Sequence, residues 1–460
     1  MSDRYDLLVV GGGPAGYVAA IRAAQLGKKV ACIEKERAGG ICLNWGCIPT
    51  KSLLRNAELY QLIQHRAGDF GFKINGDLSY DWQKIIGRSQ KVADQLAGGI
   101  ESLFRKNKVD YVVGEGTISA PDSVSVRPKE GEGRTLRGKN ILVSTGVRPR
   151  PLPGLPFNGT TVLSSREAMS LPKQPASMVI IGAGAIGVEF AYFYNAFGTK
   201  VTLVEMMPHI LPVEDQEISQ ALERSFQRQG IKMLLGTKFE SGKTSSKGVE
   251  LKLSGAQTET IKADVALVAI GVEALLPPGL SFTLERGFIK VNERYETSVR
   301  GIYAAGDVIG PPWLAHVASY EAIQAVEGLY TDRTPKRVTI FPGCTYCQPQ
   351  VASIGLTEQA AREQGKQFRV GRFPFRASGK ALAVGEADGF VKLVIGQPLG
   401  EILGAHIIGA EATELIAELG VAMTLEATYE EIEATIHAHP TLSEAVHEAT
   451  AAAFGEAIHI

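Results

Sequence analysis

Residues 7–16, LLVVGGGPAG, begin a pattern that residues 178–187, MVIIGAGAIG, repeat. In each copy an apolar strand leads into three glycines spaced G-x-G-x-x-G, and a helix and a second strand follow. The second strand ends in Glu34 in the first copy and in Glu205 in the second, 23 residues after the first glycine in both. This order of strand, glycine turn, helix, strand and acid is typical of a Rossmann-type fold. The sequence therefore predicts two such folds and two bound dinucleotides.

The glycines, the helix and the acid each have a physical role in such a site. The first glycine turns the chain tightly, the second lets the backbone approach a pyrophosphate, and the third lets helix and sheet pack closely. The helix offers free N–H groups and a positive dipole end to the phosphates, and the acid accepts hydrogen bonds from ribose hydroxyls. We expect the first dinucleotide at Gly11, Gly13, Pro14, Ala15, Gly16 and Glu34, and the second at Gly182, Gly184, Ala185, Ile186, Gly187 and Glu205.

Glu205 also favours NAD over NADP at the second site. A carboxylate there repels the 2′-phosphate of NADP, which such sites usually neutralise with an Arg. The residues after Glu205 read MMPH, and no Arg or Lys occurs before Arg224. We therefore expect NAD.

Composition excludes several classes of protein. A chain of 460 residues predicts two to four domains, roughly one per 100–200 residues. Lys plus Arg (48) nearly equal Asp plus Glu (49), which leaves no basic footprint for nucleic acid or an anionic membrane. No apolar run reaches the roughly 18 residues of a membrane helix, and residues 1–4, MSDR, lack a signal-peptide pattern. Five cysteines are too few for a secreted disulfide scaffold, so we expect a cytoplasmic protein, although a processed organellar protein would have a similar composition.

Two cysteines lie five residues apart in residues 39–54, GGICLNWGCIPTKSLL. Gly46 gives the chain freedom to bring Cys42 and Cys47 together. The sequence PTKSLL favours a helix start, which places Cys47 near a helix N-terminus, and Lys51 adds positive charge. Both effects stabilise a thiolate, the species that thiol–disulfide exchange needs. The alternative is a pair of inert buried thiols.

The same stretch resembles G-G-x-C-L-N-x-G-C-x-P-[ST]-K, the active-site signature of class I flavoprotein disulfide reductases, and the resemblance extends along essentially the whole chain. It implies FAD in the first fold, NAD in the second, a redox-active Cys42–Cys47 disulfide and a homodimer. It further implies oxidation of protein-bound dihydrolipoamide as part of a 2-oxo acid dehydrogenase complex. The expected partners are the lipoyl and peripheral subunit-binding domains of an acyltransferase.

Smaller motifs support this resemblance. Residues 144–149, STGVRP, resemble the family's A-T-G-x-x-P turn, and residues 302–307, IYAAGD, resemble its second FAD fingerprint, whose Asp contacts the ribityl chain and the pyrophosphate end. The resemblance adds these expected FAD contacts: Lys35, Gly40, Lys51, Gly114, Thr145, Gly146, Asp307 and Ala315. It adds Gly271 for NAD.

The remaining catalytic residues follow from the resemblance. Residues 437–444, HAHPTLSE, are similar to the family's H-x-H-P-T-x-x-E, which makes His439 the acid/base and Glu444 its orienting partner. In the family, the histidine that corresponds to His439 reaches the disulfide of the other subunit. We interpret the neighbouring His437 as structural. Glu189 is implied to pair with Lys51 near the flavin N5, where Lys51 favours negative charge on the reduced flavin and on a thiolate.

The sequence predicts an α/β fold class with two Rossmann-like dinucleotide-binding domains, a central domain and a carboxyl-terminal α+β dimerisation domain. The expected divisions are an FAD domain at 1–149, an NAD domain at 150–275, a central domain that completes the FAD site at 276–342, and an interface domain at 343–460. Pro- and Gly-rich stretches such as 147–156 mark the boundaries.

Other features leave alternatives open. Cys344 and Cys347 form a C-x-x-C that suggests a redox pair or half a zinc site, but no second cysteine pair completes a metal site, and we interpret them as part of an ordinary strand. No metal is expected. Val272-Glu273 stands where the family usually has Arg-x-Pro-Asn. The rival functions are a glutathione reductase, which would need an Arg near Glu205, a mercuric reductase, which would typically end in a cysteine pair, and a redox-inert nucleotide-binding scaffold.

Overall fold

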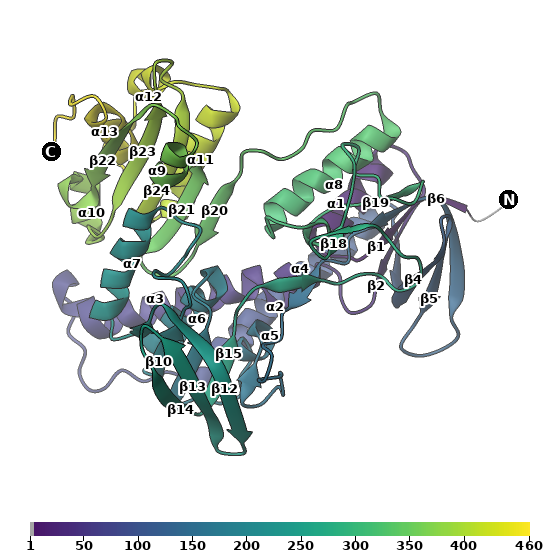
Figure 1. Ribbon diagram of the computed structural model, residues 1–460, viewed down its shortest axis with the longest axis horizontal. Helices are drawn as coiled ribbons and strands as arrows, with labels where there is room; N and C mark the ends of the chain where they lie inside the picture. Colours follow the sequence, from purple (N-terminus) through teal and green to yellow (C-terminus); the bar gives the residue numbers. More distant parts are fainter. Residues whose placement is uncertain (1–3) are drawn as a thin grey trace. The chain divides into compact units, whose positions relative to one another are not determined.

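The computed structural model describes residues 4–460, which form two compact units (Figure 1). The first unit combines residues 4–53, Asp81–Arg150 and Gly271–Thr339, and the second combines Leu54–Tyr80, Pro151–Ile270 and Ile340–Ile460. Residues 1–3, which are part of our expectation that the chain opens without a signal peptide, lie outside the described residues. The division into four consecutive domains stays a prediction.

The first unit is built on one sheet with the strand order β3-β2-β1-β6-β5-β4, and β19 pairs with β6 beside this path. The strands are β1 (Arg4–Val10), β2 (Val30–Glu34), β3 (Asp110–Val113), β4 (Glu115–Ala120), β5 (Ser123–Arg127), β6 (Arg134–Val143) and β19 (Ile302–Ala304). β1 pairs in parallel with β2 and β6, and β19 pairs in parallel with β6. All five residues of β2 are buried, as expected of a strand inside a parallel sheet covered on both faces.

The helices of the first unit are α1 (Pro14–Gln25), α2 (Gly40–Trp45), α4 (Trp82–Lys106), α8 (Ala315–Tyr330) and the short 3-10 helix η2 (Asp307–Ile309), and α3 (Cys47–Arg66) begins in this unit and ends in the second. α1 packs on α8 through alanines at one-turn spacing, among them Ala19 and Ala23 on α1 and Ala322 and Ala325 on α8. These small side chains let the two helices approach closely. In this way a segment some 300 residues downstream covers the amino-terminal fold.

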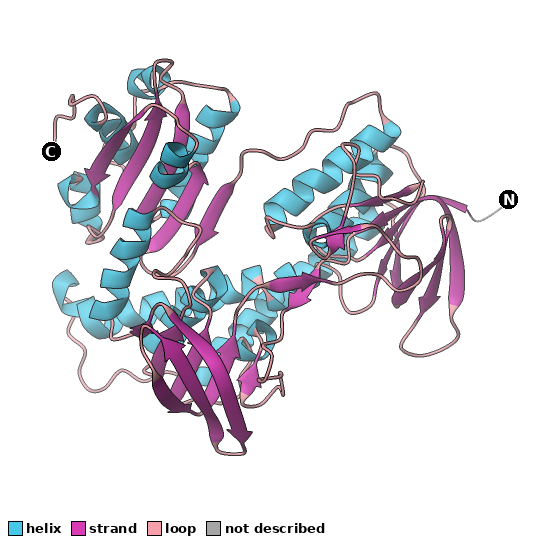
Figure 2. Ribbon diagram, in the orientation of Figure 1, coloured by secondary structure: helices cyan, strands magenta, loops and turns pink. Residues whose placement is uncertain are grey.

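The second unit contains the repeat of the nucleotide-binding fold. Its parallel sheet has the order β11-β10-β9-β15-β8, and a three-stranded antiparallel sheet has the order β12-β13-β14. Figure 2 draws the strands in magenta and the helices in cyan. The elements are β8 (Val162–Leu163), α5 (Ser165–Ala168), β9 (Ser177–Ile181), α6 (Ala185–Ala196), β10 (Lys200–Val204), α7 (Gln216–Arg228), β11 (Lys232–Leu234), β12 (Thr237–Ser245), β13 (Gly248–Gly255), β14 (Glu259–Ala263) and β15 (Val265–Val268).

The carboxyl-terminal part of the second unit is an antiparallel sheet with helices. Its strand order is β20-β21-β24-β23-β22. The strands are β20 (Pro342–Thr345), β21 (Gln350–Gly355), β22 (Phe368–Pro374), β23 (Phe390–Gly396) and β24 (Ile402–Gly409), and the helices are α9 (Glu358–Glu363), α10 (Gly379–Val384), α11 (Ala412–Thr424), α12 (Tyr429–Ala434) and α13 (Glu444–Ala452). The predicted α/β class, with two Rossmann-like folds and a carboxyl-terminal α+β part, is confirmed.

The short strands β7 (Val147–Pro149) and β16 (Val272–Ala274) pair in an antiparallel ribbon. Residues 147–149, which we expected in a linker, are therefore hydrogen-bonded to the segment that contains the atypical Val272-Glu273 sequence. Glu273 forms an ion pair with Arg148, at 2.7 Å. Among residues 4–460 we find no helix that is both long and apolar enough to cross a membrane.

Candidate active site

Both glycine turns fold in the same way. Gly11 follows β1 and Gly182 follows β9, each with a positive φ, +107° and +102°. A Cβ at Gly16 would collide with the carbonyl oxygen of Gly11, and a Cβ at Gly187 would collide with that of Gly182. The third glycine of each motif is therefore required by the contact between the helix and its own turn.

The acid that closes each repeat is held by backbone N–H groups. Glu34 accepts one hydrogen bond from Gly12 at 2.7 Å and one from Glu36 at 2.8 Å. The donors to Glu205 are the equivalent N–H groups of Ala183 and Met207, both at 2.8 Å. Both carboxylates are buried beside their glycine turns, in the position where a ribose would meet them.

The first unit also contains polar groups outside the glycine turn that suit a dinucleotide. The Thr145 hydroxyl is buried and finds no hydrogen-bond partner among residues 4–460. Asp307, at the start of η2, lies in the same unit, and its pKa is raised to about 6, chiefly by burial and then by the charge of Glu321. Glu321 in turn accepts a hydrogen bond from the N–H of Gly306, at 2.9 Å. A buried hydroxyl without a partner and a buried acid need a polar ligand, and the sugar and pyrophosphate of FAD fit them.

The second turn has apolar side chains on its outside. Ile186, in the first turn of α6, is 44% exposed, and Met206, next to Glu205, is 71% exposed. Exposed apolar side chains beside a phosphate-binding turn suit the base of a nucleotide. The residues present therefore fit NAD in the second unit. Gly271, the remaining predicted NAD contact, belongs to the first unit, where its carbonyl accepts the N–H of Arg150 at 3.0 Å.

The two predicted redox cysteines lie side by side. Cys42 is on α2, Cys47 is the first residue of α3, and only Gly46 separates the two helices. The side chains of Cys42 and Cys47 hydrogen-bond to each other, and this bond, followed by burial, raises the pKa of Cys42, against the opposing charge of Lys51. Cys42 therefore keeps its proton more tightly than an ordinary thiol does while Cys47 lies beside it.

The predicted acid/base pair is formed in the second unit. Nδ1 of His439 lies 2.9 Å from Oε1 of Glu444, and Oε2 of Glu444 accepts the N–H of Thr441 at 2.8 Å. Burial works to raise the pKa of Glu444, but the hydrogen bonds from Thr441 and His439 outweigh it and lower the pKa. The carboxylate therefore fixes Nδ1, and Nε2 remains for a substrate because the His439 side chain is 80% exposed.

Other predicted residues have clear structural places. His437 is nearly buried and lies 2.6 Å from Glu418, as expected of a structural histidine. Glu189 is buried on α6 and accepts the N–H of Tyr346 at 3.0 Å. Glu189 and Lys51 belong to different units, so their pairing stays a prediction.

The last predicted FAD contacts lie in the first unit. They are Gly13 as the N-cap of α1, Pro14 and Ala15 as its first residues, Lys35 exposed after β2, Gly40 at the start of α2, Gly114 after β3, Gly146 after β6 and Ala315 as the first residue of α8. Sequence analysis did not single out Glu321, which no motif marks and which only folding brings to Gly306.

The C-x-x-C pair lies on and after β20, and Tyr346 between the two cysteines donates the N–H that Glu189 of α6 accepts. Cys347 is fully buried with its sulfur 3.2 Å from the carbonyl of Pro349, and Cys344 is partly buried in the carboxyl-terminal core. Cys32 is buried in β2, as expected of a core residue. Across residues 4–460 no group of three or more His, Cys, Asp or Glu side chains could hold a metal ion.

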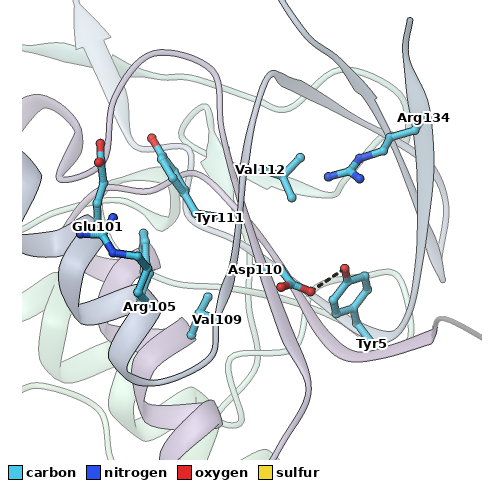
Figure 3. A pocket seen from close by; sticks show the side chains of 9 residues that line it. Tyr5, Glu101, Arg105, Val109, Asp110, Tyr111, Val112 and Arg134 are labelled. Carbon is cyan, nitrogen blue, oxygen red and sulfur yellow. Dashed lines mark hydrogen bonds between the residues drawn. The ribbon is translucent and has the colours of Figure 1, made fainter.

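A surface cavity of about 450 Å³ lies elsewhere in the first unit (Figure 3). Tyr5 and Asp110, joined by a 2.8 Å hydrogen bond, line it together with Arg105 and Arg134. Tyr5 is the second residue of β1 and Asp110 is the first residue of β3, whereas the glycine turn follows the end of β1. The cavity therefore lies at the amino end of β1, and the predicted dinucleotide site lies at its carboxyl end.

Comparisons with known proteins agree with this geometry. Residues 5–322 match the family described as pyridine nucleotide-disulphide oxidoreductase, and residues 341–450 match its dimerisation domain. Dihydrolipoyl dehydrogenase of Zymomonas mobilis is 46% identical and that of Rhizobium etli is 43% identical, both over 100% of each chain. Among solved structures, LpdA of Mycobacterium tuberculosis has a TM-score of 0.89 and 26% identity, covering 96% of this chain and 98% of its own.

Proposed function

The chain belongs to the pyridine nucleotide-disulphide oxidoreductase family, and within it we propose that the protein oxidises dihydrolipoamide to lipoamide with NAD, as a dihydrolipoyl dehydrogenase. The observation that carries the proposal is the contact of Cys42 with Cys47 beside Lys51, in a chain that is similar over its full length to enzymes of that name. Glu205, with its two backbone hydrogen bonds, supports NAD as the nucleotide.

FAD is proposed in the first fold, with Glu34, Thr145 and Asp307 among its contacts, and NAD in the second. The flavin supplies the two-electron link between a dithiol and nicotinamide. The protein supplies the sites that hold both nucleotides and the positive charge of Lys51 next to the sulfurs.

The cysteine pair and the histidine account for the chemistry of the dithiol. A substrate thiol gives its proton to Nε2 of His439 and attacks Cys42, and the bond between Cys42 and Cys47 breaks with Cys47 leaving as a thiolate. His439 releases the first proton to solvent and takes the proton of the second substrate thiol. That sulfur bonds to the first as Cys42 leaves as a thiolate, which releases the oxidised cyclic disulfide and leaves the pair reduced. Glu444 stabilises His439 each time the ring holds a proton taken from the substrate.

We further propose that the protein is a homodimer in which His439 serves the cysteine pair of the other copy. The match to the dimerisation domain covers the carboxyl-terminal sheet. An apolar depression of about 420 Å³, lined by residues such as Ile340, Ile354 and Val421, offers a contact face there. The lipoyl and peripheral subunit-binding domains of an acyltransferase are the proposed partners, and the cytoplasm is the proposed location.

The test is an assay of dihydrolipoamide-dependent NAD reduction by the FAD-loaded protein, run beside glutathione disulfide reduction with NADPH and mercuric ion reduction with NADPH. We expect activity with dihydrolipoamide and NAD, and at least tenfold less with NADP because Glu205 repels the 2′-phosphate. Greater activity with glutathione disulfide or mercuric ion than with dihydrolipoamide would overturn the proposal.

A further inference from the structure

Tyr17 lies in the first unit near the cysteine pair and has no place in the function proposed so far. It lies in α1, is half buried, and packs against the same apolar core as Cys42 and Ile48. Its hydroxyl has no hydrogen-bond partner among residues 4–460, and its oxygen is not fully buried. The donor of this phenol is therefore available to an acceptor nearby, and the charges of Cys42 and Cys47 reach it.

A contact between glycines explains why Tyr17 and Cys42 come together. The N–H of Gly39 donates to the carbonyl of Gly12 at 2.8 Å, and a Cβ on Gly40 would lie only 2.7 Å from the Cα of Gly13. The amino ends of α1 and α2 are therefore in backbone contact. Tyr17 is one turn into α1, with its N–H bonded to the carbonyl of Gly13 at 2.9 Å, and Cys42 is the third residue of α2.

The electrostatics agree with this placement. Burial raises the pKa of Tyr17, and the charges of Cys42 and then of Cys47 raise it further. A phenol whose pKa is raised keeps its proton at neutral pH and remains a hydrogen-bond donor. The influence of Cys42 comes before that of Cys47, in agreement with the contact between the amino ends of α1 and α2.

We propose that the Tyr17 hydroxyl donates a hydrogen bond to the sulfur of Cys42 whenever that sulfur carries negative charge. The need arises in the second exchange step, and to that extent the inference rests on the proposed function. The second substrate sulfur bonds to the first, the bond from the first to Cys42 breaks, and the electron pair stays on Cys42 as a thiolate. Burial and Cys47 oppose charge on Cys42, whereas Lys51 favours it. The hydrogen bond from Tyr17 adds a second favourable interaction.

Tyr17 is thus a positioning residue, and the test is alkylation of the reduced, FAD-loaded protein. The enzyme is reduced with a phosphine, and the rate at which iodoacetamide alkylates Cys42 is followed from pH 6 to pH 10 by peptide mass spectrometry. Because only the thiolate reacts, Tyr17→Phe should slow the alkylation of Cys42 about tenfold on the rising part of the profile and move its midpoint upward by about one pH unit. Alkylation of Cys47 should change much less.

Tyr111→Phe is the matched control. Tyr111 packs against the same core, but its hydroxyl bonds to the backbone of Ala38, and neither Cys42 nor Cys47 influences its pKa. An unchanged profile for Tyr17→Phe, or an equal slowing in Tyr111→Phe, would overturn the inference. The alkylation experiment uses no lipoamide, so it tests Tyr17 separately from the proposed function. If Tyr17→Phe slows the alkylation of Cys42 as expected but the natural protein does not oxidise dihydrolipoamide, the proposed function is refuted and the role of Tyr17 is not.

Discussion

At the scale of the residue, folding buries the carboxyl group of Asp307 beside a second acid, Glu321, and the pKa of Asp307 rises from 3.8 to about 6. Because the folded protein holds this proton more tightly than the unfolded chain does, ionisation of Asp307 opposes folding. The penalty is absent below about pH 4, grows as pH rises, and is complete above about pH 6, where it is on the order of 2–3 kcal/mol. A group that destabilises the protein at neutral pH is best explained by a ligand that uses it.

Asp307→Asn should therefore stabilise the FAD-free protein at pH 8 and not at pH 4, while it weakens the binding of FAD. Urea unfolding of the FAD-free variant and the FAD-free natural sequence at both pH values measures the first effect, and FAD titration measures the second. An equal change in the urea midpoint at pH 4 and pH 8 would mean that the charge of Asp307 is not the cause.

A second prediction at this scale concerns the sulfurs. Cys47→Ser removes the leaving thiolate of the exchange, and we expect lipoamide turnover to fall by about three orders of magnitude or more. Cys344→Ser, a cysteine outside the proposed chemistry, serves as the control and should retain most of the activity. Steady-state or stopped-flow assays at matched FAD content measure the rate of lipoamide turnover. Full turnover in Cys47→Ser would show that the cysteine pair takes no part in the mechanism.

At the scale of the element, the two glycine turns have the same form and different predicted ligands, which allows a paired experiment. Gly16→Ala should abolish FAD retention, because the added Cβ meets the carbonyl of Gly11. Gly187→Ala should leave FAD bound and raise the KM for NAD about tenfold or more, because the collision with the carbonyl of Gly182 lies in the second fold. FAD absorbance after gel filtration and NAD saturation curves measure the two effects, and a loss of FAD in Gly187→Ala would contradict the assignment of the folds.

The elements show which parts of the structure were predictable. β1, α1 and β2, like β9, α6 and β10, follow from local patterns, because apolar strands, glycine turns and helix starts are encoded within about 25 neighbouring residues. The packing of α8 on α1 was not predictable in the same way. Alanine spacing marks both helices as candidates for close packing, but nothing in either segment identifies the other as its partner.

At the scale of the whole molecule, the contacts that sequence analysis missed are those between distant segments. Lys392 on β23 is 1% exposed and contacts Asp215, which caps α7, at 2.8 Å and Glu358, which begins α9, also at 2.8 Å. Charged residues at these positions predict exposed surface when read one at a time. Only the fold brings the two carboxylates to the ammonium group of Lys392. Their negative charges compensate the cost of burying its positive charge.

The proposed shared active site makes a prediction for the assembled molecule. A His439→Gln protein and a Cys47→Ser protein should each be nearly inactive, but refolded together in equal amounts they should regain about a quarter of natural activity. Half of the random dimers are mixed, and each mixed dimer holds one site with an intact Cys47 and an intact His439 from different chains. If the histidine instead serves its own chain's cysteines, the mixture should show no more activity than the two variants measured separately.

The two carboxylates that close the nucleotide repeats have a consequence for attempts to re-engineer coenzyme preference. Glu205 holds two backbone N–H groups, those of Ala183 and Met207, besides any contact it makes with a ribose. Replacing it with a small neutral residue to admit a 2′-phosphate would orphan both donors inside the protein, at roughly 1–3 kcal/mol each. A successful redesign therefore has to supply a new acceptor for those amides as well as a cation for the phosphate. Substitutions that change only the charge at Glu205 should yield enzymes of lower stability.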